Sequence, residues 1–357
     1  MHISLIPAGG ADTASSRIRA FSLQKALCSV GVNAEIGYSE QADIFFIQKK
    51  LTKEILNVAE QERKKGKLII YDLDDSGEAL EYWAPEYLLN KMFGIAHIIT
   101  TDTDSRVDYI KQRYHLKNIY LLPDCVDYFP EKPIRQNQKN EQKLKVLWFG
   151  SYSNIKLFEK YVLALCGMKN VQVVVITNAA SIAEMRRKYP LVNCVAWTEH
   201  DFIFNLQSCD ISCLMHDDSE INSLKSNNRM ITSIIWGVPA VVSKTIEYSK
   251  TAYESKISEF IFSTEDELIF VVEKLRSQEA RSQYLGLCQE VIWEKYSPQA
   301  VAKRFLKIVT EYPNSRTSEK IENNFNYFKY IFRISTIRVF FGKYAPNILK
   351  DIYKLLQ

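Results

Sequence analysis

The sequence predicts an α/β fold made of two doubly wound halves, and three observations lead to this prediction. Short apolar strands alternate with amphipathic helices from residue 1 to about residue 130. The same alternation begins again at Leu144. Between the halves, residues 131–143 are polar, with three Lys, three Gln and two Asn. We therefore predict domains at 1–130 and 144–312, joined by a linker at 131–143.

Composition places the chain among ordinary globular proteins. The 357 residues are 46% hydrophobic and 25% charged, and the net charge of +4 is too small to predict a nucleic-acid partner. No apolar run reaches the roughly 18 residues of a membrane span, and the first residues lack the basic region of a signal peptide. The seven cysteines show neither C-x-x-C spacing nor a nearby zinc-spaced histidine, so we expect reduced thiols, no metal site and a cytoplasmic location.

In the first half, each predicted strand is a short apolar run, and each predicted helix shows apolar residues expected to face the core. The first helix carries Ile18, Phe21 and Leu27 on its buried face and stops at Gly31. The predicted strands are residues 3–6, 43–47, 67–71, 96–100 and 118–123, and the helices after the first are residues 52–65 and 105–114.

The loop after the first strand carries small and basic residues. Gly10 lies in this loop, and Arg17 and Arg19 lie at the start of the helix that follows. A helix N-terminus favours anions over cations, so these arginines either bind an anion or reach solvent with their stems on the core. The loop is not G-x-G-x-x-G, so it carries no dinucleotide fingerprint.

Three carboxylates follow the strand predicted at residues 67–71. Parallel sheets bind their ligands beside the carboxyl ends of their strands, and Asp72, Asp74 and Asp75 fall there. Their mutual repulsion favours a function for Asp72 and Asp74, as a base, a hydroxyl anchor or a metal ligand. The alternative is that Asp75 or Ser76 caps a helix and that Asp74 is merely solvated.

The second half repeats the alternation. Its predicted strands are residues 144–149, 171–177, 192–197, 210–214, 240–242 and 260–262, with helices at 264–276 and 296–312. Gly150 and Ser151 form a small-residue loop after the first of these strands, where a backbone can approach a phosphate closely. Lys156 lies nearby in the sequence and would assist such binding.

The segment from Lys225 to Ser243 predicts a polar loop, a short helix and a buried strand. Asn227 or Asn228 is the expected N-cap, and Gly237 suits the end of the helix. Lys225 and Arg229 lie at the start of this helix, where two cations beside backbone N–H groups make a site for a phosphate or diphosphate. The alternative is that both side chains reach solvent. Because two cations crowd the helix dipole when no anion is bound, the diphosphate hypothesis predicts that Arg229→Ala leaves the unliganded protein as stable or slightly more stable.

Three motifs resemble a known fold family. K-S-x-N-R from Lys225, with the short helix, G-x-P and Val-rich strand after it, resembles the donor-binding segment of GT-B glycosyltransferases, notably the family 4-like group. S-S-R-I-R-A-F from Ser15 resembles the opening of bacterial surface-polysaccharide glycosyltransferases, and L-P-x-x-V-D from Leu122 resembles the last segment of a GT-B N-domain. The resemblance implies two Rossmann-like domains facing across a cleft, and we expect a C-terminal helical tail in addition to them.

The resemblance also implies an activity and a set of site residues. It implies transfer of a hexosyl or related group from a nucleotide sugar to a glycan or lipid-linked acceptor, in cell-surface polysaccharide synthesis. Lys225 and Arg229 would stabilise the leaving diphosphate without a metal ion or cofactor, and Asp72 or Asp74 would act on the acceptor. The implied donor-binding residues are Gly10, Arg17, Gly150, Ser151, Lys156, Trp197, Thr198, Lys225, Ser226, Asn228, Arg229 and Thr232. The residue predicted to stack on the base is Trp197, for which a core position is the alternative.

The sequence departs from the family at one motif and leaves two other activities open. Many family members carry E-x7-E, with a ribose-binding glutamate, where this chain has Leu224 and Thr232. A sugar-nucleotide-binding GT-B protein without catalysis is therefore one alternative. The other is a haloacid-dehalogenase-type phosphatase, because residues 69–74 match its h-h-h-D-x-D strand with Asp72 and Asp74. That motif normally opens its domain, whereas here a strand and a helix precede it.

The last 45 residues, 313–357, differ in composition from the rest. From Asn324 onward the chain has six Lys or Arg, one acidic residue and nine aromatic residues. This content predicts that residues 320–357 contact an anionic membrane, on the inner face of the plasma membrane. The alternative is that these aromatic side chains pack on the N-terminal domain.

Overall fold

A computed structural model describes residues 1–135, 143–216 and 219–315 of the chain. Residues 1–308 form one compact unit, to which the described residues 309–315 do not belong. Most of the predicted linker, 131–143, and nearly all of the predicted tail, 313–357, lie outside the described residues. The domain boundaries and the membrane contact of residues 320–357 therefore stay predictions.

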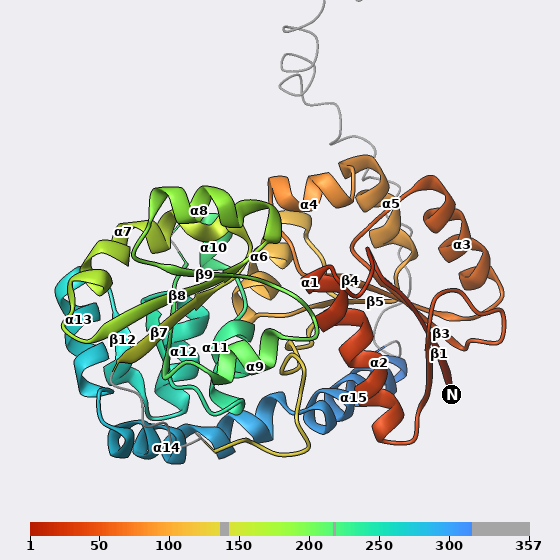
Figure 1. The fold of residues 1–357 in the computed structure, drawn as a ribbon. Helices are drawn as coiled ribbons and strands as arrows, with labels where there is room; N and C mark the ends of the chain where they lie inside the picture. Colours follow the sequence, from red (N-terminus) through yellow and green to blue (C-terminus); the bar gives the residue numbers. More distant parts are fainter. Residues whose placement is uncertain (136–142, 217–218, 316–357) are drawn as a thin grey trace, which may run out of the picture. The chain divides into compact units, whose positions relative to one another are not determined.

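The first half of the compact unit forms a parallel six-stranded sheet, here sheet A, with helices around it (Figure 1). The strand order is β2-β1-β3-β4-β5-β6, and every neighbouring pair is parallel. Its strands are β1 (His2–Ile6), β2 (Asn33–Ile36), β3 (Ile44–Gln48), β4 (Leu68–Leu73), β5 (Ile98–Thr101) and β6 (Ile119–Leu121). The order reverses between β1 and β3, which is the topological switch point of this sheet.

The second half forms sheet B, which is also parallel and six-stranded (Figure 1). Its order is β12-β11-β10-β7-β8-β9, so its switch point lies between β7 and β10. Its strands are β7 (Leu144–Phe149), β8 (Val171–Thr177), β9 (Asn193–Ala196), β10 (Ile211–Leu214), β11 (Ala240–Ser243) and β12 (Ile261–Phe262). The two sheets confirm the predicted doubly wound α/β fold.

Helices connect the strands of sheet A. They are α1 (Ala14–Ser16), the π-helix η1 (Arg17–Ser22), α2 (Leu23–Ser29), α3 (Lys53–Lys64), α4 (Glu78–Trp83), α5 (Glu86–Ile95) and α6 (Asp104–Tyr114). The sequence predicted an ordinary helix after the first strand, whereas residues 17–22 of this helical segment form a π-helix, a rare form that occurs often at functional sites. Strand β2 and helices α4 and α5 had not been predicted. Strand β2 escaped notice because it has only four residues, with one of them buried.

Helices also connect the strands of sheet B or follow the last of them. They are η2 (Tyr152–Asn154), α7 (Ile155–Gly167), η3 (Ala179–Ser181), α8 (Ile182–Lys188), α9 (Phe202–Gln207), α10 (Glu220–Ser223), α11 (Asn228–Ile235), α12 (Ile246–Glu254), η4 (Ser258–Phe260), α13 (Glu265–Lys274), α14 (Gln278–Tyr296) and α15 (Pro298–Ser315). Among the residues described, no helix is both long and apolar enough to cross a membrane.

Helix α11 forms where the sequence predicted a helix. Its four apolar residues at helical spacing are fully buried, and Asn227 is the N-cap. The Asn227 side chain does not cap the helix but donates to the hydroxyls of Thr251 (2.6 Å) and Tyr296 (2.8 Å). Gly237 ends the helix with φ of +82°, and a Cβ there would lie 2.8 Å from the backbone oxygen of Ile134. Both its conformation and this close approach require glycine.

Candidate functional site

Arg229 connects helix α11 to the switch point of sheet B. Its Nη1 donates to the backbone oxygen of Phe149 at the end of β7 (3.0 Å). Its Nη2 donates to the backbone oxygen of Met215, just after β10 (3.0 Å). The carboxyl ends of the two strands at the switch point therefore hold one guanidinium group between them. Ligands bind at this place in open α/β sheets.

A small pocket opens beside this arginine. It is lined by Asn154, Lys156, Leu157, Met215, His216, Asn222 and Lys225. The Nζ of Lys225 lies 3.0 Å from Oδ1 of Asn154, which follows β7. Lys156 and Lys225 thus line the pocket, and Arg229 bonds to Met215 and His216 of the lining. Such a cluster of donors and positive charges suits an anion.

His216 is a pocket residue that the sequence analysis missed. Its ring stacks on that of Tyr248, with centroids 5.0 Å apart, and both ring nitrogens lie 3.2 Å from Nη2 of Arg229. Burial, together with the charges of Arg229 and Lys225, holds the pKa of His216 well below its usual value. The imidazole is therefore neutral near pH 7 and keeps one N–H that can donate. The sequence signal that could have identified His216 is its position just after a buried strand.

Of the glycines and loop residues predicted to bind the donor, only some lie near this pocket. A Cβ atom on Gly150 would lie 3.1 Å from Nη1 of Arg229, so glycine lets the guanidinium approach β7. Ser151 follows it and is exposed. Gly10 lies in the loop after β1, and neither residue is among those lining the pocket. Beside that loop, the side chain of Gln48, the last residue of β3, accepts hydrogen bonds from Ser16 Oγ (3.0 Å) and from the backbone N–H of residue 8 (3.0 Å).

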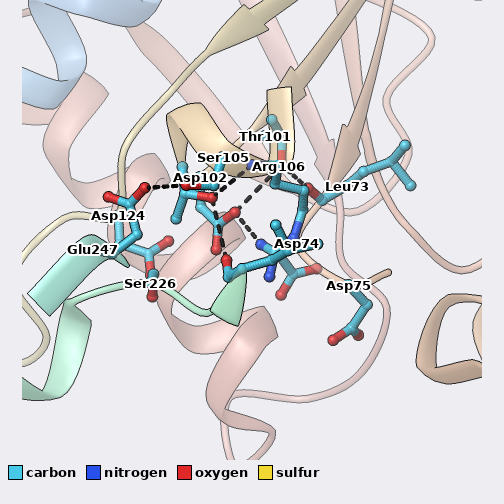
Figure 2. Close-up of polar contacts among 12 residues, drawn as sticks. Leu73, Asp74, Asp75, Thr101, Asp102, Ser105, Arg106, Asp124, Ser226 and Glu247 are labelled. Atoms are coloured by element: carbon cyan, nitrogen blue, oxygen red, sulfur yellow. Dashed lines mark hydrogen bonds and ion pairs between the residues drawn. The ribbon is translucent and has the colours of Figure 1, made fainter. Parts of the chain in front are cut away.

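Three other predicted donor-binding residues bond to the segment 124–127, which follows β6. Ser226 Oγ donates to the carboxylate that opens this segment (2.7 Å; Figure 2). Asn228 Nδ2 donates to the backbone oxygen of residue 125 (2.9 Å), and Thr232 Oγ1 accepts from the N–H of residue 127 (3.1 Å). In this structure the three side chains therefore join helix α11 and the loop before it to the end of the first half.

The predicted base-stacking residue, Trp197, lies against an arginine. The Cζ of Arg17 is 5.2 Å from the Trp197 ring centroid and 4.9 Å from that of Tyr128, which are cation–π distances. Arg17 also pairs with both carboxylate oxygens of Asp127, at 2.9 Å for the closest contact. Next to Trp197, Thr198 Oγ1 donates to an aspartate side chain three residues on (2.9 Å).

The three carboxylates predicted after β4 have different surroundings. Asp72 is 0% exposed, and its two oxygens accept from Arg19 at 2.5 and 3.0 Å. Thr100 Oγ1 donates to the same carboxylate (2.7 Å). Burial raises the pKa of Asp72 even though the Arg19 guanidinium lowers it. This side chain is enclosed by its own partners, and a general base must reach the proton it takes.

Asp74 and Asp75 lie closer to the surface and share one cation. Lys49 Nζ is 3.2 Å from Asp74 and 2.5 Å from Asp75. The Asp75 side chain is 28% exposed. Burial, and secondly the charge of Asp74, raise the pKa of Asp75 despite the lysine. Figure 2 shows Asp74 near Arg106 and Asp75 farther out, with both aspartates on the far side from Ser226.

Within the described ranges, no group of three or more His, Cys, Asp or Glu side chains is arranged to hold a metal ion. That the protein needs no metal ion stays a prediction.

Comparison with known proteins identifies the fold. No family profile matches the sequence, and no curated protein matches it. By contrast, 242 solved chains match the structure. HepE from Anabaena, solved in complex with UDP, superimposes with a TM-score of 0.64 at 10% identity, covering 87% of this chain and 100% of its own. A glycosyltransferase from Rickettsia africae gives 0.61 at 8% identity, covering 87% and 98%.

TarM of S. aureus, which has also been solved with UDP, matches over a shorter part of its length. The TM-score is 0.55 at 13% identity, with 74% of this chain covered, and the chain spans about half (54%) of TarM. These structures are GT-B glycosyltransferases, so the chain has the predicted GT-B fold. At such identities the likeness establishes the fold alone. The narrower resemblance to family 4 and to surface-polysaccharide enzymes rests on the sequence motifs.

Proposed function

We propose that this chain is a glycosyltransferase that moves a hexosyl or related group from a nucleotide sugar to a glycan or lipid-linked acceptor. The observation that carries the proposal is the position of Arg229, Lys225 and Lys156 around one pocket at the switch point of sheet B. A diphosphate suits this pocket because it brings the negative charge that these cations require. The UDP complexes of HepE and TarM, which share the fold, support the choice of ligand.

In the proposed reaction the pocket stabilises the leaving group. Negative charge grows on the departing diphosphate as its bond to the sugar breaks, and Lys225 and Arg229 compensate that charge at fixed positions. Neutral His216 adds one N–H donor without adding a third positive charge. With two cations in this place we propose that transfer needs neither a divalent metal ion nor a cofactor.

The remaining predicted donor residues would bind the nucleoside and the sugar. Trp197 and Thr198 would meet the base, which requires Trp197 to exchange Arg17 for the base as its stacking partner. Thr232 stands where related enzymes carry a ribose-binding glutamate, and its hydroxyl already bonds to the N–H of Asp127. We therefore propose that ribose is held differently in this chain.

The burial of Asp72 weighs against the phosphatase alternative. A nucleophilic aspartate must be open to attack a phosphorus atom, and this one is enclosed by Arg19 and Thr100. The alternative of a binding protein without catalysis remains, because binding and turnover are separate measurements. Family 4 membership, a role in surface-polysaccharide synthesis, a cytoplasmic location and association with the inner face of the plasma membrane are further proposals, supported by motifs and composition.

Calorimetric titration with UDP in the presence of EDTA tests the proposal. We expect binding that EDTA leaves unchanged. We expect Arg229→Ala and Lys225→Ala each to weaken it by roughly one to two orders of magnitude, because a hydrogen bond to a charged group contributes about 1.5–3 kcal/mol. Lys169→Ala, which removes an exposed lysine elsewhere, is the matched control and should bind as the wild type does.

Two outcomes would contradict the proposal: unchanged affinity in both pocket variants, or binding that EDTA abolishes. Release of UDP from nucleotide sugars then separates an enzyme from a protein that only binds them.

The two hydrogen bonds from Arg229 to backbone carbonyl groups also change the stability expected of Arg229→Ala. Arg229→Ala removes both bonds from the unliganded protein, so we now expect a loss of stability rather than none.

A further inference from the structure

The end of helix α4 presents two aromatic side chains, Tyr82 and Trp83, here called the aromatic lip. Tyr82 is 80% exposed, and Trp83 is half-buried. Their rings stand nearly perpendicular, at 88°, with centroids 5.1 Å apart. Large aromatic faces left in water are unfavourable and often mark a place where another molecule binds.

Lys49 joins the aromatic lip to the carboxylates after β4. Its Nζ lies 5.0 Å from the centroid of the Trp83 ring, and the same atom bonds to Asp74 and Asp75. The Oγ of Ser76 is buried there and has no hydrogen-bond partner among the described residues. One small region therefore combines an aromatic surface, a partly exposed carboxylate and a hydroxyl without a partner.

This region lies at the same edge of sheet A as a contact with the segment just before Lys225. Strands β4 and β5 are neighbours, and the residue that caps α6 after β5, Thr103, donates through its hydroxyl to the backbone oxygen of Leu224 (3.2 Å). Leu224 directly precedes Lys225 of the proposed diphosphate pocket. Figure 2 shows Asp74 near Arg106, one turn along the helix that Thr103 caps, and Asp75 farther out.

We propose that the aromatic lip, with Asp75, binds a sugar ring of a carbohydrate acceptor. A pyranose has an apolar C–H face that can lie on an aromatic ring, and hydroxyl groups that can donate to a carboxylate. Two aspartates around one lysine leave this region without surplus positive charge, so a phosphorylated acceptor group would not be favoured there. The proposal rests on the proposed glycosyltransferase function, and it narrows the acceptor group bound at this surface to a glycan.

Fluorine NMR of the protein labelled with 5-fluorotryptophan tests this site. The chain has five tryptophans, and Trp83→Phe identifies the Trp83 signal. The probes are the methyl glycosides of glucose, galactose, mannose and N-acetylglucosamine, added to the UDP-saturated protein at tens of millimolar. We expect at least one of them to shift the Trp83 signal in a saturable manner.

Two variants and one control make the test specific. Tyr82→Ala and Asp75→Asn should each weaken the glycoside response by about fivefold or more, the loss of roughly one kcal/mol of contact. Tyr253→Ala removes another exposed tyrosine, 69% accessible on α12, and should respond as the wild type does. A Trp83 signal that no glycoside moves, or one that moves equally in Tyr82→Ala, would overturn the proposal, and an unchanged response in Asp75→Asn would remove Asp75 from the site.

A UDP titration of the same samples separates this proposal from the one on which it rests. UDP binding without any glycoside response contradicts the carbohydrate site alone. If UDP does not bind, the result contradicts the proposed glycosyltransferase function, on which the carbohydrate site rests.

Discussion

A Cβ atom on Gly150 would lie 3.1 Å from Nη1 of Arg229. The two residues meet because Arg229 passes over Gly150 to donate to the backbone oxygen of Phe149 at the end of β7. The absence of a side chain at Gly150 therefore sets where the guanidinium rests. The small-residue loop was predicted as a site of close backbone approach to a phosphate, and the structure shows close approach to the cation proposed to bind one.

Gly150→Ala should weaken UDP binding, because the added methyl group pushes the guanidinium away from its position at the switch point. We expect a loss of roughly tenfold, about 1.4 kcal/mol, measured by calorimetry. Gly167→Ala is the matched control, since a Cβ there meets nothing within 4 Å. Equal affinities in the two variants would show that the position of Arg229 does not matter for binding.

Thr232→Val should destabilise the protein. The hydroxyl accepts a hydrogen bond from the buried N–H of Asp127 (3.1 Å), and valine keeps the shape but leaves this donor without a partner. The expected cost is about 1–3 kcal/mol, measured by urea unfolding. Thr232→Ser retains the hydroxyl and serves as the control. If the valine variant is no less stable than the serine variant, the bond contributes nothing.

Apart from β2, the sequence predicted the strands of both sheets, because most of them are short apolar runs of buried residues. Helix α11 was predicted for a similar reason, since its apolar residues recur at helical spacing and Gly237 ends it. Helix α4 was not predicted, because its six residues are too few to show a period.

The site was harder to predict than the fold, because its contacts join distant parts of the chain. Arg17 and Arg19 were both candidate anion ligands, yet each pairs with an aspartate, at 110 and 53 residues' separation. Nothing in the local sequence names those partners. Trp197 was expected either to stack on a base or to lie in the core, and an interaction with Arg17 was not considered. Side-chain pairing of this kind follows from the tertiary fold, which local patterns do not contain.

Asp124 makes stability depend on pH. Burial raises the pKa of its carboxyl group to about 6, although Arg19 and Ser226 favour the charged form. An unperturbed aspartate titrates near pH 3.9, so between about pH 4 and 6 the folded state binds more protons than the unfolded state. The contribution of Asp124 to stability is therefore present at low pH and lost as the pH rises through 6.

The comparison of wild type with Asp124→Asn isolates this contribution. Asparagine does not titrate, so the free energy of unfolding of the wild type should fall relative to that of the variant from about pH 4.5 to 6.5, by roughly 1–3 kcal/mol. Urea unfolding at several pH values measures it, with Asp266→Asn, an exposed aspartate, as the control. Parallel pH curves for the wild type and Asp124→Asn would refute the assignment.

Asp72→Asn distinguishes a structural aspartate from a catalytic one. The substitution leaves the buried Arg19 with one carboxylate fewer, and breaking a buried ion pair costs about 3–5 kcal/mol. We therefore expect a large loss of stability by urea unfolding, and a clearly smaller loss in Asp75→Asn, whose side chain is partly exposed. Near-native stability of Asp72→Asn with abolished turnover would instead make Asp72 the base that the sequence suggested. A phosphoenzyme formed at Asp72 would restore the phosphatase alternative, because the enclosed carboxylate would then have to open to its substrate.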